Sequence, residues 1–256
     1  MTESKKRYGW KPDIPDHRDM LFSAAPRMQA PVALPPSADL MKWMPDVYNQ
    51  GETNSCTGNA CASATECLRI KDGRPMLTNP SRLHIYYGAR VLGGYEAVDC
   101  GATIRDTMKA LSSWGYCDEE LWPFDPKRIV VRPPKTVYDA ASKYRLVEYC
   151  RLNQNIMEIK AALAQGHPVI LGISIYESFE GELVAKTGIV NMPGPKEAMR
   201  GGHAVVLIGY DDRKQRWLLR NSWGDKWGIK GNFTLPYQYI LNPDLAADLW
   251  VLRVVP

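Results

Sequence analysis

Apolar residues follow a helical period in the first half of the chain and form short dense runs in the second half. The helical period is clearest where apolar or small residues stand at 56, 60, 61, 64, 67 and 68, the spacing of a helix with one buried face. Asn54 or Ser55 precedes this stretch and is suited to cap it. Further helices are predicted at 103–114 and 155–165, and buried strands at 168–175, 204–210 and 217–221. The chain is therefore expected to place its main helices before its main strands.

Three stretches without a regular period lie before and between these elements. The first 33 residues are rich in Pro, Asp and Arg, and we predict an extended arm there, with Trp10 and Phe22 packed on the rest of the protein. The proline-rich stretch 123–134 is interpreted as a crossing between two halves. The glycine-rich stretch 177–202 is interpreted as a loop beside a functional cleft.

Composition is that of an ordinary globular protein. The 256 residues are 45% hydrophobic and 23% charged, enough to bury a core in one large domain or two halves. The formal net charge is only +4, and the basic residues are interspersed with acids, so no nucleic-acid partner is expected. No apolar run reaches the roughly 18 residues of a membrane span, and no signal peptide is recognised. No membrane association is expected, and the location is left open between the cytoplasm and export by another route.

The cysteine pattern argues against both a full set of disulfides and a metal site. The six cysteines are Cys56, Cys61, Cys67, Cys100, Cys117 and Cys150. If Cys56 stays a free thiol, the five others cannot all pair with one another. No C-x-x-C or paired Cys/His spacing is present, so neither a metal nor an organic cofactor is expected. The remaining assignments are structural, with small core residues at Cys61 and Cys67 and structural histidines at His17, His84 and His167.

Four residues have the types that a thiol nucleophile requires. Gln50 and Cys56 lie six positions apart, His203 follows 147 positions after the cysteine, and Asn221 lies in the segment Arg220-Asn-Ser-Trp-Gly224. A cysteine with a distant histidine and asparagine is the pattern of a nucleophile, its base and a residue that orients the base. These segments resemble the papain-like cysteine peptidases, and Cys56-Thr-Gly-Asn-Ala60 resembles a bacterial-type branch of that family.

The resemblance is strongest over residues 34–70, 99–126 and 201–236. It implies a two-lobe α+β fold, with a helical lobe at about 40–126, a β-barrel-like lobe at about 127–256, and the active cleft between the lobes. Residues 34–256 would form the peptidase domain, because the sequence from Leu34 resembles the start of a mature enzyme. Residues 1–33 would then be a short pro-segment, as in a zymogen, lying in the cleft.

The resemblance also implies a role for each of the four residues. Cys56 would be the nucleophile, activated as a thiolate by the first turn of its helix and by an imidazolium at His203. The side-chain carbonyl of Asn221 would orient that imidazole. Gln50, together with the backbone N–H of Cys56, would stabilise the oxyanion of the tetrahedral intermediate.

Substrate-binding residues follow from the same resemblance and from departures from the family pattern. Gly101 and Gly202 would pair with the backbone of a bound peptide. Trp223 would shield the hydrogen bond between His203 and Asn221 from water. Asn54 stands where the family usually has glycine, which alters one side of the cleft. Thr57 replaces the usual aromatic residue and Thr53 a usual half-cystine.

The expected function is hydrolysis of peptide bonds in peptide or protein substrates through an acyl-enzyme intermediate at Cys56. Two alternatives stay open. A transpeptidase or amidase would use the same residues but give the acyl group to an amine. A catalytically silent binding protein with the same fold would need none of them.

Overall fold

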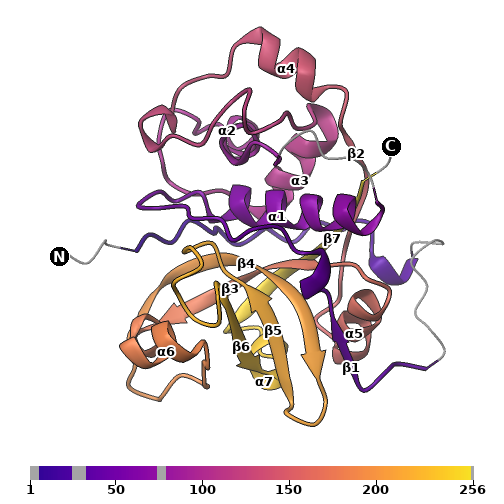
Figure 1. Cartoon of the computed structure of the whole chain (residues 1–256), viewed down its shortest axis with the longest axis vertical. Helices are drawn as coiled ribbons and strands as arrows, with labels where there is room; N and C mark the ends of the chain where they lie inside the picture. Colours follow the sequence, from indigo (N-terminus) through magenta and orange to yellow (C-terminus); the bar gives the residue numbers. More distant parts are fainter. Residues whose placement is uncertain (1–5, 25–32, 74–78, 255–256) are drawn as a thin grey trace.

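The computed structural model describes residues 6–24, 33–73 and 79–254. The helices from the first half of the chain form one part of the molecule, and a large antiparallel sheet with the later helices beside it forms the other (Figure 1). Within the described residues, no helix has both the length and the apolar character needed to cross a membrane. The predicted ends of the arm, 1–5 and 25–32, lie outside these ranges.

The helices of the described chain range from one short turn to more than four turns. The α-helices are α1 (Cys56–Lys71), α2 (Arg82–Gly93), α3 (Ile104–Ser113), α4 (Lys135–Ala141), α5 (Ile156–Ala164), α6 (Glu182–Thr187) and α7 (Tyr237–Leu241). Short 3₁₀ turns are η1 (Phe22–Ala24), η2 (Met41–Trp43), η3 (Pro126–Arg128) and η4 (Glu177–Glu180). The three predicted helices correspond to α1, α3 and α5, whereas α2 and α4 were not foreseen.

The sheet is antiparallel throughout its described pairings. Its strands are β1 (Ser37–Asp39), β2 (Leu146–Arg151), β3 (Val169–Tyr176), β4 (Met199–Asp211), β5 (Arg216–Arg220), β6 (Asn232–Pro236) and β7 (Ala246–Val254). They are ordered β2-β7-β3-β4-β5-β6, with β1 on β4. This open path gives a mixed α+β architecture in which the sheet does not close into a barrel through any described pairing. The predicted strands correspond to β3, β4 and β5.

Helix α1 lies between the sheet and helices α2 and α3 (Figure 1). The prediction of a single buried face was too narrow, because every residue from Cys56 to Arg69 is buried. A helix enclosed on two sides has no solvent face. The expected cap was also wrong: Ser55 occupies the N-cap position, but its side chain makes no cap hydrogen bond and instead accepts from the amide of Asn59 at 2.9 Å.

The glycine-rich stretch 177–202 is more regular than expected. It contains η4 and α6, and its last residues already belong to β4. The strand begins early because Tyr176 of β3 pairs with Met199 beyond a register shift. Strand pairing, which no local pattern reports, therefore overrode the glycine signal.

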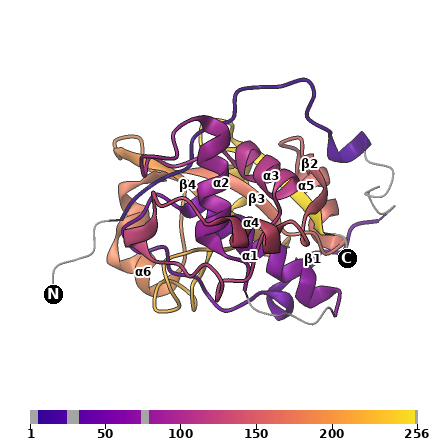
Figure 2. The ribbon, with the colours of Figure 1, turned by 90° about the horizontal axis from the view of Figure 1, so that it is seen from above.

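The N-terminal arm, defined here as the described residues 6–24, runs between the helical layer and the sheet (Figures 1 and 2). Both predicted anchors are buried, with Trp10 9% and Phe22 1% exposed. Trp10 forms an isolated parallel bridge with Ala102, and Leu21 another with Arg151. The arm is thus held by backbone pairing as well as by its aromatic side chains.

Candidate active site

Cys56 is the first residue of α1, and its side chain is completely buried. The first turn of an α-helix presents backbone N–H groups that no intrahelical acceptor satisfies. These groups favour negative charge at this end of the helix. The position expected from the sequence is therefore the position in the structure.

His203 and Asn221 come together through the pairing of β4 with β5. His203 lies within β4, and Asn221 directly follows β5, whose last residue pairs with Val206. Nε2 of His203 lies 2.8 Å from Oδ1 of Asn221. Because that carbonyl oxygen can only accept, Nε2 carries the proton, and Nδ1 is the other ring nitrogen. The ring of Trp223 packs 5.2 Å from the imidazole, centroid to centroid.

Gln50 is brought to the site by a second backbone contact. Its N–H donates to the carbonyl of Ser222 at 2.9 Å, and its Oε1 accepts from the Ser222 hydroxyl at 2.6 Å. Its Nε2 donates to the carbonyl of Thr53 at 2.9 Å and points to the carbonyl of Arg7 at 3.4 Å. The amide group of Gln50 is thus oriented by the segment next to Asn221, and it faces the arm.

The arm crosses the site as an extended strand between the two layers. The N–H of Ala102 donates to the carbonyl of Gly9 at 2.8 Å, and the N–H of Lys11 donates to the carbonyl of Ala102 at 3.0 Å. On the other side, the N–H of Trp10 donates to the carbonyl of Gly202 at 3.0 Å. A peptide backbone therefore occupies the space beside Cys56.

The four predicted substrate-binding residues all lie along the arm. A Cβ on Gly101, where φ is +84°, would lie 2.1 Å from the Gly9 carbonyl oxygen, and one on Gly202 would lie 2.7 Å from the Trp10 ring. The carbonyl of Asn54 lies against Gly9. The Trp223 ring lies 4.9 Å from Nζ of Lys6.

Ala102 and Asp248 are among the arm-contacting residues that sequence reasoning missed. Ala102, and not Gly101, makes the backbone hydrogen bonds with the arm. Asp248, in β7, accepts the indole N–H of Trp10 at 3.1 Å. No motif marks either residue; the only signal for Ala102 is its place directly after Gly101.

Burial acts against the expected charges on Cys56 and His203. Burial raises the pKa of the Cys56 thiol to about 11, although backbone hydrogen bonds from Ala204, Gly9 and Thr57 act in the opposite direction. Burial also lowers the pKa of His203 to about 4, against the hydrogen bond with Asn221, and the charge of Lys6 lowers it further. Burial beneath the arm thus disfavours the charged form of both groups, because removal from water penalises charge.

The other cysteines and histidines have structural surroundings. All six cysteines are free, and Cys61 and Cys67 are buried as expected. Burial lowers the pKa of both His84 and His167 to about 4, while His17 is exposed. Among the described residues, no group of three or more His, Cys, Asp or Glu side chains could hold a metal ion.

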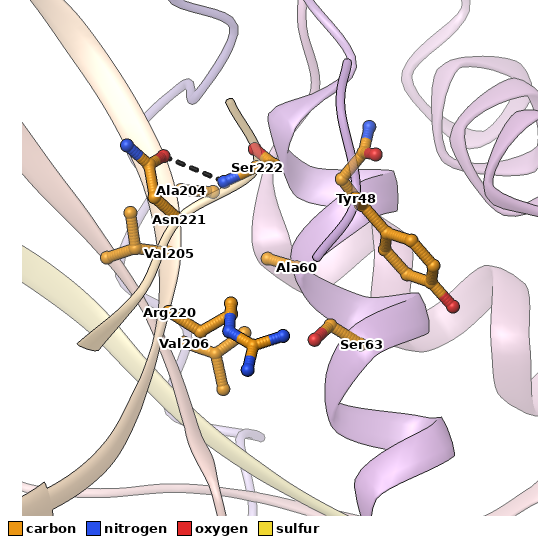
Figure 3. Close-up of a pocket in the computed structure, with 10 residues that line it drawn as sticks. Tyr48, Ala60, Ser63, Ala204, Val205, Val206, Arg220, Asn221 and Ser222 are labelled. Atoms are coloured by element: carbon orange, nitrogen blue, oxygen red, sulfur yellow. Dashed lines mark hydrogen bonds between the residues drawn. The ribbon is translucent and has the colours of Figure 1, made fainter. Parts of the chain in front are cut away.

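A small cavity lies behind the site, between α1 and the ends of β4 and β5 (Figure 3). Its volume is about 10 Å³, room for about one water molecule. Its lining includes Ser63, Arg220 and Asn221. The cavity is too small for a peptide side chain.

Comparison with known proteins agrees with this geometry. The family model described as "Papain family cysteine protease" matches residues 34–242. The chain therefore belongs to the papain family of cysteine proteases and is a cysteine-type peptidase, a hydrolase. The resemblance inferred from the sequence is confirmed.

Individual relatives support the same assignment. An uncharacterized peptidase C1-like protein of Acanthamoeba polyphaga mimivirus is 40% identical over 81% of this chain and 69% of its own length. Xylellain, a cysteine protease from Xylella fastidiosa, has a structure similar to this one at a TM-score of 0.88, with 39% identity, 97% of this chain and 96% of that chain covered. Digestive procathepsin L 3 of Tenebrio molitor shares the fold at a TM-score of 0.69 and 22% identity, covering 86% of this chain and 70% of its own.

Proposed function

We propose that this protein hydrolyses peptide bonds with Cys56 as nucleophile and that the N-terminal arm keeps it latent. The observation that carries the proposal is the course of the arm, which places a peptide backbone against Gln50, Gly202 and Cys56. The same backbone contacts are available to a substrate only when the arm has left. The exclusion of substrate by the arm therefore supports latency.

With the arm displaced, each residue has a defined task. Water entering the site would stabilise a Cys56 thiolate and a His203 imidazolium, which burial disfavours at present. The thiolate attacks the peptide carbonyl, and the oxyanion accepts from Gln50 Nε2 and the Cys56 N–H. His203 gives a proton to the leaving amine through Nδ1, while Asn221 holds Nε2. Attack of water on the thioester then releases the acid and restores the thiol.

Gly9→Val tests latency in the full chain. A Cβ at Gly9 would lie 1.7 Å from the Asn54 carbonyl oxygen, so this variant cannot dock the arm unchanged. We expect faster cleavage of fluorescein-labelled casein and faster alkylation of Cys56 than in the parent. Ile14→Ala is the matched control, because the Ile14 side chain lies in the same arm and is 82% exposed. Latency is refuted if hydrogen exchange shows a released arm while the cleavage rate stays at the parent's value.

Product analysis separates hydrolysis from acyl transfer. The Gly9→Val variant is incubated with a peptide and increasing glycinamide, and the products are identified by mass spectrometry. A hydrolase gives mainly the free acid. Dominant formation of the glycinamide adduct at low amine concentration would establish a transpeptidase instead.

A further inference from the structure

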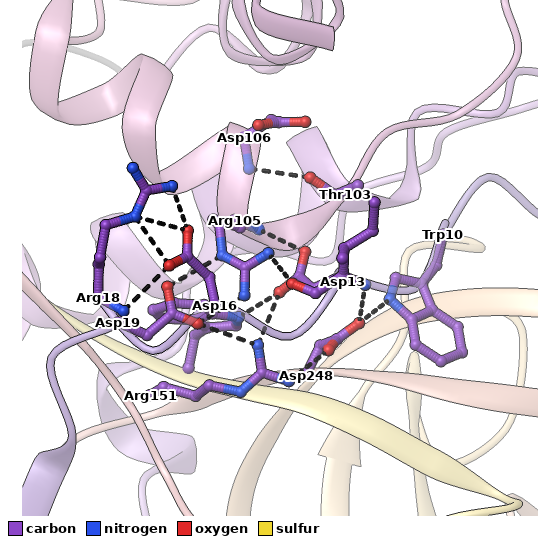
Figure 4. Close-up of polar contacts among 12 residues, drawn as sticks. Trp10, Asp13, Asp16, Arg18, Asp19, Thr103, Arg105, Asp106, Arg151 and Asp248 are labelled. Atoms are coloured by element: carbon purple, nitrogen blue, oxygen red, sulfur yellow. Dashed lines mark hydrogen bonds and ion pairs between the residues drawn. The ribbon is translucent and has the colours of Figure 1, made fainter.

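A buried cluster of charges lies where the arm meets the fold, about three residues beyond the site. Its five members are Asp13 and Asp19 of the arm, Arg105 of α3, Arg151 of β2 and Asp248 of β7 (Figure 4). Three carboxylates face two guanidinium groups, so the fully ionised cluster has one surplus negative charge. The side chains of Asp13 and Asp248 are 0% and 2% exposed, so solvent does not screen that surplus.

Asp248 joins the cluster to the part of the arm that lies in the site. Its Oδ2 accepts from the indole N–H of Trp10 at 3.1 Å and from the N–H of Asp13 at 2.8 Å, and its Oδ1 accepts from Arg151 at 2.7 Å. The Trp10 ring lies so close to Gly172 that a Cβ there would be 1.9 Å from it. The position of Trp10 thus depends on the carboxylate of Asp248.

The backbone of β7 is distorted at this carboxylate. Ile170 pairs with Trp250 and Gly172 pairs with Ala247, so two residues of β7 oppose one of β3. Asp248 is one of the two, with φ of +56°, a conformation that non-glycine residues seldom adopt. Such bulges re-aim a side chain, and here the carboxylate is directed at the arm.

Asp13 is the member of the cluster with the least favourable environment for charge. Its Oδ2 accepts from Trp250 at 2.9 Å and lies 3.3 Å from Arg151, and its Oδ1 accepts from the backbone N–H of Arg105 at 3.1 Å. Arg105 itself is paired with Asp19 at 2.5 Å. Burial, followed by the charge of Asp248, raises the pKa of Asp13 to about 6.

We propose that the Asp13–Asp248 pair is a proton-dependent latch, which holds the arm in the site in mildly acidic solution and loosens it as the pH rises toward neutrality. The proposal rests on the latency proposed above and specifies how it is regulated. A proton on Asp13 removes the surplus charge and leaves two carboxylates facing two guanidinium groups. Release of the arm exposes Asp13 to water and removes it from Asp248, so release is coupled to loss of the proton.

The sign of the effect follows from linkage. The pKa of Asp13 is higher in the docked arm than its ordinary value of 3.8, so docking takes up a proton between these two values. The proton on Asp13 contributes fully to docking when the pH is below the ordinary pKa of 3.8. This contribution is lost as the pH rises through about 6. Between pH 7 and pH 5, docking is expected to strengthen by about tenfold.

Hydrogen exchange of the arm amides tests the latch without relying on activity. The N–H groups of Trp10 and Lys11 are bound across the site, and their protection, corrected for intrinsic exchange, is measured in the full chain from pH 5 to 7.5. Protection that rises by about tenfold toward pH 5 supports the latch. Protection that does not change with pH overturns it.

Charge variants assign the effect to this cluster. In Asp13→Asn, the dependence of protection on pH should disappear, whatever its absolute level. Asp19→Asn removes one negative charge from the cluster and leaves Asp13 itself unchanged. The pH at which arm protection changes should therefore move to a lower value. Asp16→Asn is the matched control, because Asp16 pairs with the exposed Arg18 and should leave the transition in place. Retention of the native transition in Asp13→Asn would refute the proposal.

The outcome is distinguishable from failure of the latency proposal. Arm protection reports docking even in a chain whose activity does not respond to the arm. If Gly9→Val fails to gain activity while arm protection follows the pH, latency is wrong and the latch stands. If Gly9→Val gains activity and arm protection is independent of pH, the latch is wrong and latency stands.

Discussion

At the scale of single residues, the same four side chains would serve two states of the protein. Beneath the arm, burial favours the thiol form of Cys56 and the neutral form of His203. In the mechanism proposed above, hydration without the arm would lower the cost of the charged pair, and transfer of one proton from sulfur to Nδ1 would need no proton from solvent. The arm can therefore control reactivity by excluding water as well as by excluding substrate.

Alkylation at about pH 6 measures this change. In Gly9→Val, we expect iodoacetamide to modify Cys56 faster than Cys61, Cys67 or Cys117, because ordinary thiols are protonated at this pH. Adding His203→Ala should slow modification of Cys56 by at least about tenfold, since the thiolate loses its cationic partner. Mass spectrometry of the modified peptides identifies the cysteine. Equal rates for all cysteines in Gly9→Val would contradict an activated pair.

Gln50 provides a second prediction at the residue scale. In the arm-displaced background, Gln50→Ala should lower kcat for casein cleavage on the order of 100-fold, because one oxyanion donor is lost. Ser222→Ala is the matched control, since it removes the hydroxyl that binds Oε1 and keeps the Nε2 donor. Its kcat should fall much less. Equal losses in the two variants would indicate that Gln50 acts by packing only.

At the scale of elements, the site is assembled by strand pairing and by a helix start. β4 and β5 bring His203 beside Asn221, and the bridge between Asn49 and Trp223 brings Gln50 to the same place. α1 supplies Cys56 from the opposite layer. The helix ends themselves are fixed locally: Asn155 accepts from the N–H of Met157 at 2.8 Å and caps α5.

Removal of the α5 cap should destabilise the fold by a predictable amount. Asn155→Ala is expected to lower the free energy of unfolding by about 1 kcal/mol, because the first-turn N–H groups lose their acceptor. Urea denaturation measures the change. Met157→Ala, at a side chain that is 59% exposed, should change stability by less than about 0.5 kcal/mol. An equal loss in both variants would show that the cap hydrogen bond is not the cause.

At the scale of the whole molecule, acid has opposite effects on the arm and on the fold. His84, His167 and His203 have pKa values lowered by burial from 6.5 to about 4. The neutral form of these histidines contributes to stability when the pH is above their ordinary pKa of 6.5. This contribution is lost as the pH falls from 6.5 to about 4. Mild acid should therefore tighten the arm while it lowers the global free energy of unfolding.

Urea denaturation at pH 7 and pH 5 measures the predicted fall in the global free energy of unfolding. The midpoint should fall at pH 5 by the equivalent of a few kcal/mol, shared among the buried histidines. His84→Gln should reduce the difference between the two pH values, whereas His17→Gln should leave it unchanged, since His17 is exposed. A midpoint that rises toward pH 5 would contradict the neutral, buried state of these histidines.

The sequence by itself determined the family and predicted α1, α3, α5, β3, β4 and β5, because local segments carry both the periodicity and the resemblance. The catalytic roles and the boundaries of the arm and the two lobes remain predictions. Only the tertiary structure decided the complete burial of Cys56, the burial of α1 on all sides and the course of the arm. It also decided the role of Asp248, whose carboxylate meets Asp13 from 235 residues away. Burial and contacts between residues far apart in the sequence depend on tertiary packing, and tertiary packing has no local sequence pattern that predicts it.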